Sequence, residues 1–344
     1  MANERKVGVL IVGGGPAGSV CGYQLKQAGK DCLIVDRATF PRDKICGGAL
    51  SIKAWRLLDK LMPGIKYDYR PLNHIRMQFE QDPVCELDLG CELHMTNRKD
   101  FDYSLLKYYM EAGGEVLKEA FDHYEEQPDG SLVATMKSGL RIACEYLVAA
   151  DGAFSRVRKQ MFGEYKSNVF FIEQYTEPTG AHEIFGQFFK DRFPGCFYKF
   201  PGIGRDVWGY HAPQTSREQF KQLLEQFEVP KGRIVGAYIP MKVIESTHER
   251  IIFIGDAGGF ANRVTGEGLY DAFLTAYHAK RSIVEHRPFS EVNHKVFEKM
   301  EAQARLFRFA NTRFCVRLFR VVMRCPRLVK WLLDTKMKRE YWFR

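Results

Sequence analysis

Residues 6–29, KVGVLIVGGGPAGSVCGYQLKQAG, pass from an apolar, β-branched run through a cluster of glycines into a helical pattern. Gly13, Gly15 and Gly18 have the spacing GxGxxG, which permits a tight turn, a close backbone approach to a pyrophosphate and close packing of helix on strand. The phosphates of such a ligand lie on the N-terminus of the helix. The stretch therefore predicts a Rossmann-like unit that binds a dinucleotide.

A carboxylate ends the next predicted strand. DCLIVD, residues 31–36, places Asp36 eighteen residues after Gly18, where a carboxylate accepts hydrogen bonds from an adenosine ribose. GxGxxG alone is a weak signal, because a glycine-rich turn without a ligand has the same letters. The strand, turn, helix, second strand and acid, in this order, favour nucleotide binding.

Two later segments favour FAD over NAD. LVAADGAFSRVRK, residues 147–159, places Asp151 and Gly152 after a strand, and IIFIGD, residues 251–256, places an acid after another strand. The glycine turn at 266–268 then precedes a helix, whose positive end would lie near the pyrimidine side of a flavin and stabilise its anionic reduced form. NAD dehydrogenases have no use for such a late third site.

These motifs resemble the large FAD-binding family that includes aromatic hydroxylases, flavin-dependent halogenases and geranylgeranyl reductases. The resemblance runs from position 6 to about 280 and includes DGxxSxxR from Asp151 to Arg158 and an arginine, Arg98, that corresponds to the one reaching the FAD phosphate region. It implies an α/β protein with a Rossmann-like FAD-binding domain, an inserted mixed β-sheet substrate domain and a C-terminal helical tail. The expected cofactor-binding residues are Gly13, Gly15, Pro16, Ala17, Gly18, Asp36, Arg37, Lys44, Cys46, Gly47, Gly48, Arg98, Asp151, Gly152, Gly255, Asp256, Gly266, Glu267 and Gly268.

The segment PRDKICGGAL, residues 41–50, indicates the branch of the family. It is similar to the PxxKxCGG segment of geranylgeranyl reductases and their short bacterial relatives. A glycine pair lets backbone pass close to a planar ring, and a small polarizable thiol fits where a larger side chain would collide. We therefore expect Cys46, Gly47 and Gly48 beside the flavin ring, with the thiol as a proton donor or modulator; a small core cysteine is the alternative.

A second branch marker is GCFYKFPGIGRDVWGYHAP, residues 195–213. Reductases of this family commonly have YxWxFP over the substrate side, and here Cys196, Tyr198, Phe200 and Pro201 fill that frame. Halogenases would carry WxWxIP, so this segment argues against halogenation. Tyr198 joins Cys46, Gly47 and Gly48 as an expected catalytic residue. The surrounding aromatic residues would line an apolar pocket or form ordinary sheet core.

The expected domains follow from these motifs. The FAD-binding domain is discontinuous and the substrate domain is inserted into it, followed by a basic helical region. The expected boundaries are 1–70, 98–163 and 245–288 for the first, 71–97 and 164–244 for the second, and 289–344 for the last.

Composition limits the remaining classes of function. The nine cysteines form no CxxC pair and the nine histidines have no metal-ligand spacing, so reduced thiols and no metal are expected. The N-terminal segment enters a strand without an apolar stretch or a cleavage site, which predicts a cytoplasmic protein. A second GxGxxG is absent, so NAD(P)H or a protein reductant would have to supply electrons without a separate nicotinamide domain.

The basic excess lies at the end of the chain. Residues 305–344 hold twelve Lys or Arg against two acidic residues, in a formal net charge of +9 for the whole chain. Their helical period predicts either a helix that lies on an anionic membrane at the inner face, or a packed helix with an exposed arginine face. Nucleic acid is not expected, because no nucleic-acid-binding motif accompanies the charge.

The resemblance implies an FAD-dependent oxidoreductase that reduces carbon–carbon double bonds of an isoprenoid or other lipid-like substrate by hydride transfer from reduced flavin. One alternative is a flavin-dependent monooxygenase that hydroxylates an aromatic or polyene substrate. Another is a non-catalytic FAD-binding resistance factor at the membrane surface.

Overall fold

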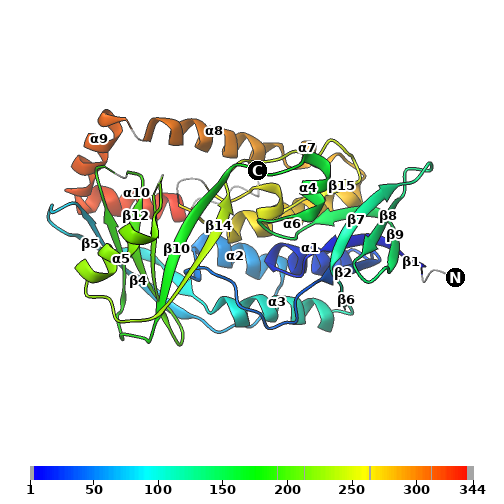
Figure 1. Ribbon diagram of the computed structural model, residues 1–344, viewed down its shortest axis with the longest axis horizontal. Coiled ribbons are helices and arrows are strands. Elements are labelled where there is room, and N and C mark those ends of the chain that lie inside the picture. The colour runs from blue at the N-terminus through cyan, green and yellow to red at the C-terminus, as the bar shows by residue number, and fades with distance from the viewer. Residues whose placement is uncertain (1–3, 192, 213, 263–264, 311, 339–344) are drawn as a thin grey trace.

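The computed structural model describes residues 4–191, 193–212, 214–262, 265–310 and 312–338. Its strands form two sheets that lie at opposite ends of the long axis, with helices between them and above them (Figure 1). The predicted fold class, an α/β protein with a second, mixed sheet and a helical C-terminal region, is confirmed.

The seven-stranded sheet contains the glycine-rich turn. Parallel strands run in the order β6-β2-β1-β9, β15 also pairs in parallel with the end of β9, and β8 and β7 continue the sheet antiparallel. Its strands are β1 (Glu4–Val12), β2 (Cys32–Asp36), β6 (Glu115–Lys118), β7 (Phe121–Glu126), β8 (Leu132–Met136), β9 (Arg141–Ala149) and β15 (Ile251–Phe253).

Both faces of this sheet are covered. Alternate residues of β1 face opposite ways, as in any strand. Val9 and Ile11 join the core under four helices, whereas Leu10 and Val12 join the core formed with β7, β8 and one short helix, α4 (Arg156–Phe162). The four helices are α1 (Pro16–Gln27), α2 (Ile52–Leu61), α3 (Arg98–Glu111) and α6 (Leu269–Glu285).

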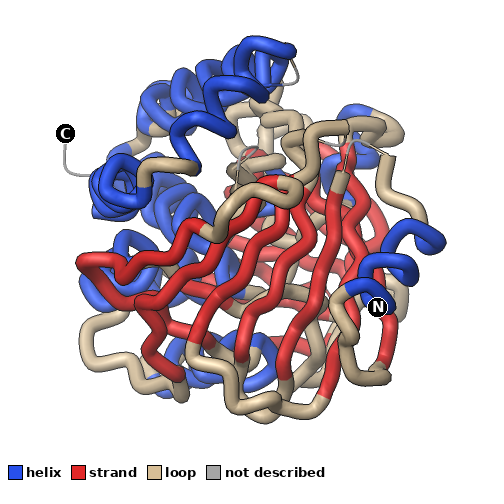
Figure 2. The backbone as a smooth tube through the Cα atoms, turned by 90° about the vertical axis from the view of Figure 1, so that its left-hand side faces the viewer, coloured by secondary structure: helices blue, strands red, loops and turns tan. Residues whose placement is uncertain are grey.

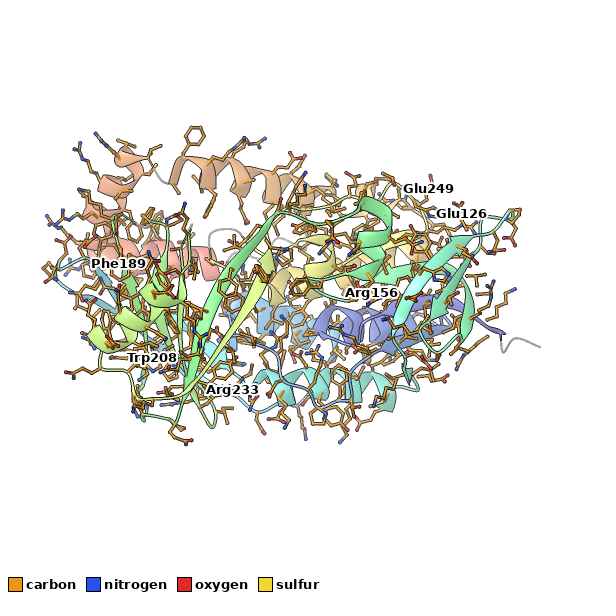
Figure 3. All side chains as sticks on the ribbon, viewed as in Figure 1. Glu126, Arg156, Phe189, Trp208, Arg233 and Glu249 are labelled. Carbon is orange, nitrogen blue, oxygen red and sulfur yellow. The ribbon has the colours of Figure 1, made fainter. Side chains whose placement is uncertain are left out.

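The eight-stranded sheet is mixed. Its order is β14-β10-β13-β12-β11-β4-β5-β3, with only β11 and β4 parallel among the neighbours, and Figure 2 shows these strands side by side. Figure 3 labels Trp208 within this sheet and Glu126 on β7 of the other. The strands are β3 (Ala49–Leu50), β4 (Arg70–Phe79), β5 (Cys85–Met95), β10 (Asn168–Thr176), β11 (Glu183–Phe188), β12 (Cys196–Pro201), β13 (Asp206–His211) and β14 (Arg233–Pro240).

The origin of these strands bears on the expected domains. Most come from the two stretches assigned to the substrate domain, 71–97 and 164–244, whereas β3 comes from the segment 1–70 and pairs with β5. A helix, α5 (Arg217–Gln226), packs on β12 and β13 through Phe220 and Leu223. The domain boundaries themselves stay a prediction.

Four helices follow α6: α7 (Phe289–Val292), α8 (His294–Ala310), α9 (Arg313–Met323) and α10 (Pro326–Lys338). Met323 and Val329 bury themselves against β4 and β5. Arg320 pairs with Asp82 through both carboxylate oxygens, at 2.6 and 2.7 Å. No helix in the described part of the chain has both the length and the apolar content needed to cross a bilayer.

The crossing of α1 over the end of β1 depends on Gly18. A side chain on Gly18 would overlap the carbonyl oxygen of Gly13, and one on Gly13 would overlap the backbone of Ala150 at the end of β9. Gly13 also has a φ of +110°, which favours glycine. These two approaches hold α1, β1 and β9 together at the turn.

We predict that Gly18→Ala lowers the free energy of unfolding by about 2 kcal/mol or more, because neither backbone can move away without disturbing the sheet. Chemical unfolding followed by circular dichroism measures the change. Gly186→Ala on β11 is the matched control: a Cβ there meets its nearest neighbours at 3.6 Å, so its effect should stay below about 1 kcal/mol. Equal losses in both variants would contradict the argument.

Candidate active site

Four parallel strands end at the same level. Val35 of β2 pairs with Val12 of β1, Val12 pairs with Ala149 of β9, and Ala149 pairs with Phe253 of β15. Ligand sites in open parallel sheets form at the carboxyl ends of the strands. The residues that follow this row are the ones singled out in the sequence: the glycine turn after β1, Asp36 on β2, and the acids after β9 and β15.

One cavity of about 1430 Å³ extends from this edge to the inner side of the larger sheet. A single ligand site usually has roughly 300–1,000 Å³, so this cavity has room for more than one reactant. All but two of the residues expected to bind cofactor or to act in catalysis line it. The two exceptions are Gly18 and Gly255: Gly18 packs on Gly13, and a Cβ on Gly255 would lie 3.0 Å from that of Ala17.

The glycine turn and Asp36 form one end of the cavity. The Asp36 carboxylate accepts hydrogen bonds from the backbone N–H of Gly14 and of Ala38, both at 2.7 Å, so it holds the turn as well as facing the cavity with Arg37. Helix α1 begins after Gly15 without a side-chain cap. Pro16 has no N–H, so the free backbone donors of this helix start at Ala17, which lines the cavity and can donate to an anion.

Arg158 fixes two strand ends to each other. The residue is 2% exposed, and its guanidinium donates to the carbonyls of Asp256 and Ala257, at 3.1 and 2.7 Å, and to that of Ala153. It therefore connects the DGxxSxxR segment to a short 3₁₀ helix, η1 (Gly255–Gly258), that follows β15. The motif arginine acts here through backbone carbonyls and not by facing a ligand.

Asp151 and Gly152, the first two residues of the DGxxSxxR segment, line the cavity. Burial raises the pKa of Asp151, although hydrogen bonds from Ser155 and from backbone N–H groups of α4 act in the opposite direction. Its Oδ1 is buried and has no hydrogen-bond partner among the described residues. A buried acceptor of this kind is suited to a ligand hydroxyl.

Arg98 lies inside the protein and not on a free surface. It is 4% exposed and makes two hydrogen bonds, of 2.7 and 3.1 Å, to Asp102 one turn along α3. Burial disfavours its charge, but Asp102 and the nearby Cys46 thiol raise its pKa above the ordinary value. Arg42 also approaches Asp102, at 3.5 Å. The charge of this pair of arginines is therefore shared with a carboxylate before any ligand binds.

The turn before α6 closes the other side of the cavity. Helix α6 begins after Gly268 without a side-chain cap, as α1 does, so a second helix N-terminus faces the same space. Glu267 points instead to Lys53, at 2.7 Å, and to Ser51. That ion pair holds the 266–268 turn, including Gly266, against the start of α2.

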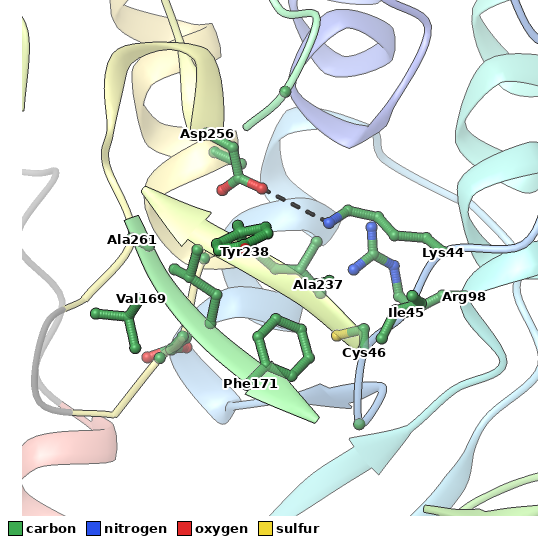
Figure 4. A pocket seen from close by; sticks show the side chains of 18 of the residues that line it. Lys44, Ile45, Cys46, Arg98, Val169, Phe171, Ala237, Tyr238, Asp256 and Ala261 are labelled. Atoms are coloured by element: carbon green, nitrogen blue, oxygen red, sulfur yellow. Dashed lines mark ion pairs between the residues drawn. The ribbon is translucent and has the colours of Figure 1, made fainter. Parts of the chain in front are cut away.

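Residues 41–48, which carry Cys46, form a loop that we call the thiol loop. Lys44 connects this loop to the side of the cavity that the turn before α6 closes. Its Nζ lies 3.6 Å from a carboxylate oxygen of Asp256, across the cavity, as the dashed line in Figure 4 shows. Cys46 and Arg98 lie beside it, and Phe171 faces them from the larger sheet (Figure 4). The expected neighbours of the flavin ring thus converge from both sheets.

The two segments that resemble the geranylgeranyl reductases, residues 41–50 and 195–213, contact each other. A Cβ on Gly47 would lie 2.5 Å from the ring of Phe200, so the thiol loop packs directly on β12. Gly48, with a φ of +76°, accepts hydrogen bonds from the N–H and hydroxyl of Thr96, at 2.8 and 3.0 Å. The loop is therefore held against the larger sheet at two points.

A buried carboxylate that the sequence analysis did not single out lies beside Tyr198. Glu173 on β10 is 1% exposed and accepts hydrogen bonds from Tyr198, at 3.0 Å, and from Tyr175, at 3.3 Å. Burial raises the pKa of Glu173 to about 7, against the opposing effect of the two tyrosine hydroxyls. Near neutral pH the site therefore holds an exchangeable proton.

The register of three strands makes this contact possible. Glu173, Gly209 and Tyr198 lie in one row across β10, β13 and β12. A side chain on Gly209 would overlap the ring of Tyr198. The central strand leaves that space open, so the tyrosine hydroxyl reaches across it to the carboxylate.

Arg42 is a further lining residue that was not expected from the sequence. Its Nη2 is the nearest atom to a Cβ built on Gly15, at 3.3 Å, so it lies at the phosphate end. The available signals were an arginine inside the thiol loop and, for Glu173, a single acid in the aromatic strand NVFFIEQYT. Of the aromatic residues expected to line a pocket, Phe170, Phe171, Phe185, Phe188 and Phe200 do so, whereas Phe197 and Tyr210 pack on α5.

One group of side chains, a histidine with two glutamates, has the composition of a metal site, although the sequence predicted no metal. His74, Glu86 and Glu183 come together from β4, β5 and β11. Arg76 pairs with Glu183 at 2.8 Å, and His74 bonds to Asp88 and Glu86, whose carboxylates raise its pKa. These carboxylates already have cationic partners, so the group forms an ion-pair network.

The residues present fit FAD. Two uncapped helix N-termini, a glycine cradle and an unpartnered buried carboxylate oxygen line one cavity, and these are groups that phosphates and sugar hydroxyls of FAD would need. FAD bound as the sequence predicts would have its adenosine ribose beside Asp36 and Arg37 and its ring beside Lys44 and Cys46, and all four residues line the cavity.

Comparisons with known proteins agree with this fit. Residues 6–169 match the FAD binding domain family. The chain is 26% identical over 326 residues to the chloroplastic geranylgeranyl diphosphate reductase of Oryza sativa subsp. japonica. The matched region covers 83% of this chain and 68% of that protein.

Two solved structures show the same fold. A geranylgeranyl bacteriochlorophyll reductase-like protein from Thermoplasma acidophilum has a TM-score of 0.72 at 17% identity, over 99% of this chain and 94% of its own. A probable FAD-dependent monooxygenase from Pseudomonas aeruginosa has a TM-score of 0.70 at 15% identity, over 96% and 100%. The fold is thus shared by proteins described as a reductase and as a monooxygenase.

The buried Glu173 predicts a pH dependence of stability. Its folded pKa of about 7 exceeds its ordinary value of 4.5, so between these two pH values the unfolded chain has lost a proton that the folded chain keeps. Stability therefore falls as the pH rises through this window and levels off above it. Because one pKa unit corresponds to about 1.4 kcal/mol, the loss is about 3 kcal/mol.

Glu173→Gln should remove this loss, since a carboxamide oxygen still accepts from Tyr198 but carries no charge. Urea unfolding at pH 5 and pH 8 measures it. Glu218→Gln, at an exposed position on α5, should keep the wild-type pH dependence. The same slope in Glu173→Gln and in the wild type would refute the proposed protonation of Glu173.

Proposed function

This chain is an FAD-dependent oxidoreductase related to the geranylgeranyl reductases, and we propose that it reduces carbon–carbon double bonds of an isoprenoid or other lipid-like substrate. One observation carries the proposal. The cavity lined by the expected FAD-binding residues is also lined by a group of aliphatic and aromatic side chains and by the hydrogen-bonded pair of Glu173 and Tyr198.

The apolar end fits a hydrocarbon chain. Its lining residues come from β4, β5, β11 and two C-terminal helices and include Ile75, Met77, Leu93, Ile184, Phe307 and Leu333. None of these side chains has a polar group that a hydrocarbon would leave without a partner. A substrate with a long apolar part therefore suits this end better than a small polar acid.

Reduction of an alkene needs a hydride at one carbon and a proton at the other. Bound FAD, once reduced, supplies the hydride. Glu173 and Tyr198 can hold the proton, because the carboxyl is protonated below about pH 7 and the tyrosine hydroxyl bonds to it at 3.0 Å. Phe171 and Phe200 line the adjacent wall and exclude water from it.

The thiol loop positions this region. Packing of Gly47 on Phe200 and the bonds of Gly48 to Thr96 set the distance between the loop and β12. Cys46 faces the same space, as a small side chain that leaves room for a ring. As electron donor we propose NAD(P)H or a reduced protein that reaches the same cavity.

The reaction can be tested with geranylgeranyl diphosphate as the probe. We expect the yellow protein, reduced with dithionite without oxygen, to regain its oxidised flavin spectrum when the probe is added, and the product to gain two hydrogens by mass spectrometry. Reoxidation only on admission of air, with one oxygen added to an aromatic or polyene probe, would favour a monooxygenase. A colourless protein that does not take up FAD would reject both reactions.

Proton supply gives a second expectation. If Glu173 is the acid, substrate-dependent reoxidation slows as the pH rises above about 7, and Glu173→Gln lowers the rate about a hundredfold at pH 6 and removes this pH dependence. Tyr198→Phe should also lower the rate, whereas Tyr210→Phe on β13, which packs toward α5, should not. Rapid-mixing absorbance measurements give these rates. An unchanged pH profile in Glu173→Gln would remove Glu173 from the mechanism.

A further inference from the structure

The exposed apolar residues of the protein are concentrated on the C-terminal helices. Eight of the fourteen large hydrophobic side chains that are exposed among the described residues lie between positions 306 and 332. They are Leu306, Phe309, Phe314, Leu318, Val321, Leu328, Trp331 and Leu332. We call this set, with the arginines beside it, the C-terminal face. Such a cluster in so short a segment marks an interaction surface.

Arginines lie next to these apolar residues. On α9, Phe314, Leu318 and Val321 form one exposed row, and Arg313, Arg317, Arg320 and Arg324 form the row beside it, each with helical spacing. Arg305, Arg308 and Arg327 are also exposed. Of these seven arginines, only Arg320 and Arg324 have a carboxylate partner in the described part of the chain, and both pair with Asp82.

The helices are firmly attached by their other sides. Met323 and Val329 are buried on β4 and β5, and the Gly90 backbone N–H donates to Asp334 at 2.8 Å. The apolar row of α9 is therefore exposed while its opposite side is already packed. This helix thus has a third side, beyond the packed side and the arginine row that the sequence predicted.

Charge decides which partner fits. Two copies of this face would bring arginines against arginines, which disfavours self-association. A neutral apolar partner would leave five arginines without a counter-charge. An anionic bilayer offers hydrocarbon for the aromatic and aliphatic side chains and, directly above it, headgroup phosphates for the arginines beside them.

The face also lies over the apolar end of the cavity. Phe307 on α8 and Leu333 on α10 line that end, and each is a neighbour in sequence of an exposed member of the face, Leu306 or Leu332. Figure 1 shows α8, α9 and α10 together on one side of the larger sheet. We propose that the C-terminal face docks on an anionic lipid bilayer, and that lipid enters the cavity beneath these helices.

Binding of vesicles tests the docking. We expect the FAD-loaded full-length protein to sediment with vesicles of phosphatidylcholine and phosphatidylglycerol, less with phosphatidylcholine alone, and less at high salt. Arg313→Gln with Arg317→Gln should weaken binding roughly thirtyfold. Phe314→Glu with Leu318→Glu should abolish it. All four positions are exposed, so folding and flavin content should stay unchanged.

The matched control is Lys221→Gln with Lys231→Gln, two exposed cations outside the C-terminal face, one on α5 and one between α5 and β14, which should bind as the wild type does. Quenching of tryptophan fluorescence by brominated lipid, lost in Trp331→Phe, would place the face in the bilayer. Absence of vesicle binding, or equal losses in the control, would overturn the proposal. Vesicle-independent dimers that the Phe314 and Leu318 changes dissolve would overturn it too, in favour of a second copy.

Entry of lipid beneath the helices rests on the proposed function, whereas docking does not. Vesicle binding by a protein that fails to reduce geranylgeranyl diphosphate would keep the docking and reject the reaction. Reduction of the soluble probe by a protein that ignores vesicles would do the reverse. The two measurements therefore fail independently.

Discussion

The site depends on a backbone contact that only glycine allows. The carbonyl oxygen of Gly13 occupies the space that a side chain on Gly18 would need, and Gly13 itself lies against Ala150. Because of these contacts, α1 begins at the level where β1, β2, β9 and β15 end. A helix displaced by one side chain would move its free N–H groups away from the row of strand ends.

A second constraint acts on the larger sheet. Tyr198 reaches Glu173 only because Gly209, between them, has no side chain. The thiol loop rests on Phe200, two residues further along the same strand. Strand β12 therefore sets the position of the Glu173–Tyr198 pair relative to the expected flavin region, because it carries Tyr198 and also supports the thiol loop.

The sequence was sufficient for parts of the site that depend on local spacing. The turn from Gly13 to Gly18 and the strand that ends at Asp36 follow from neighbouring residues, and the structure has them at one edge of the sheet. Glu173 could not be assigned in this way, because its environment depends on the register of strands about thirty residues apart. The helices of the tail were predictable from their period, but the side that packs depends on β4 and β5, far earlier in the chain, on which Met323 and Val329 are buried.

The order of these parts along the chain has a consequence for biosynthesis. Every residue expected to bind FAD precedes α7, whereas Phe307 and Leu333, which close the apolar end, come later. Domains form from the N-terminus as the ribosome proceeds. The nascent polypeptide thus contains every expected cofactor-binding residue before the two helices that complete the apolar end have been translated.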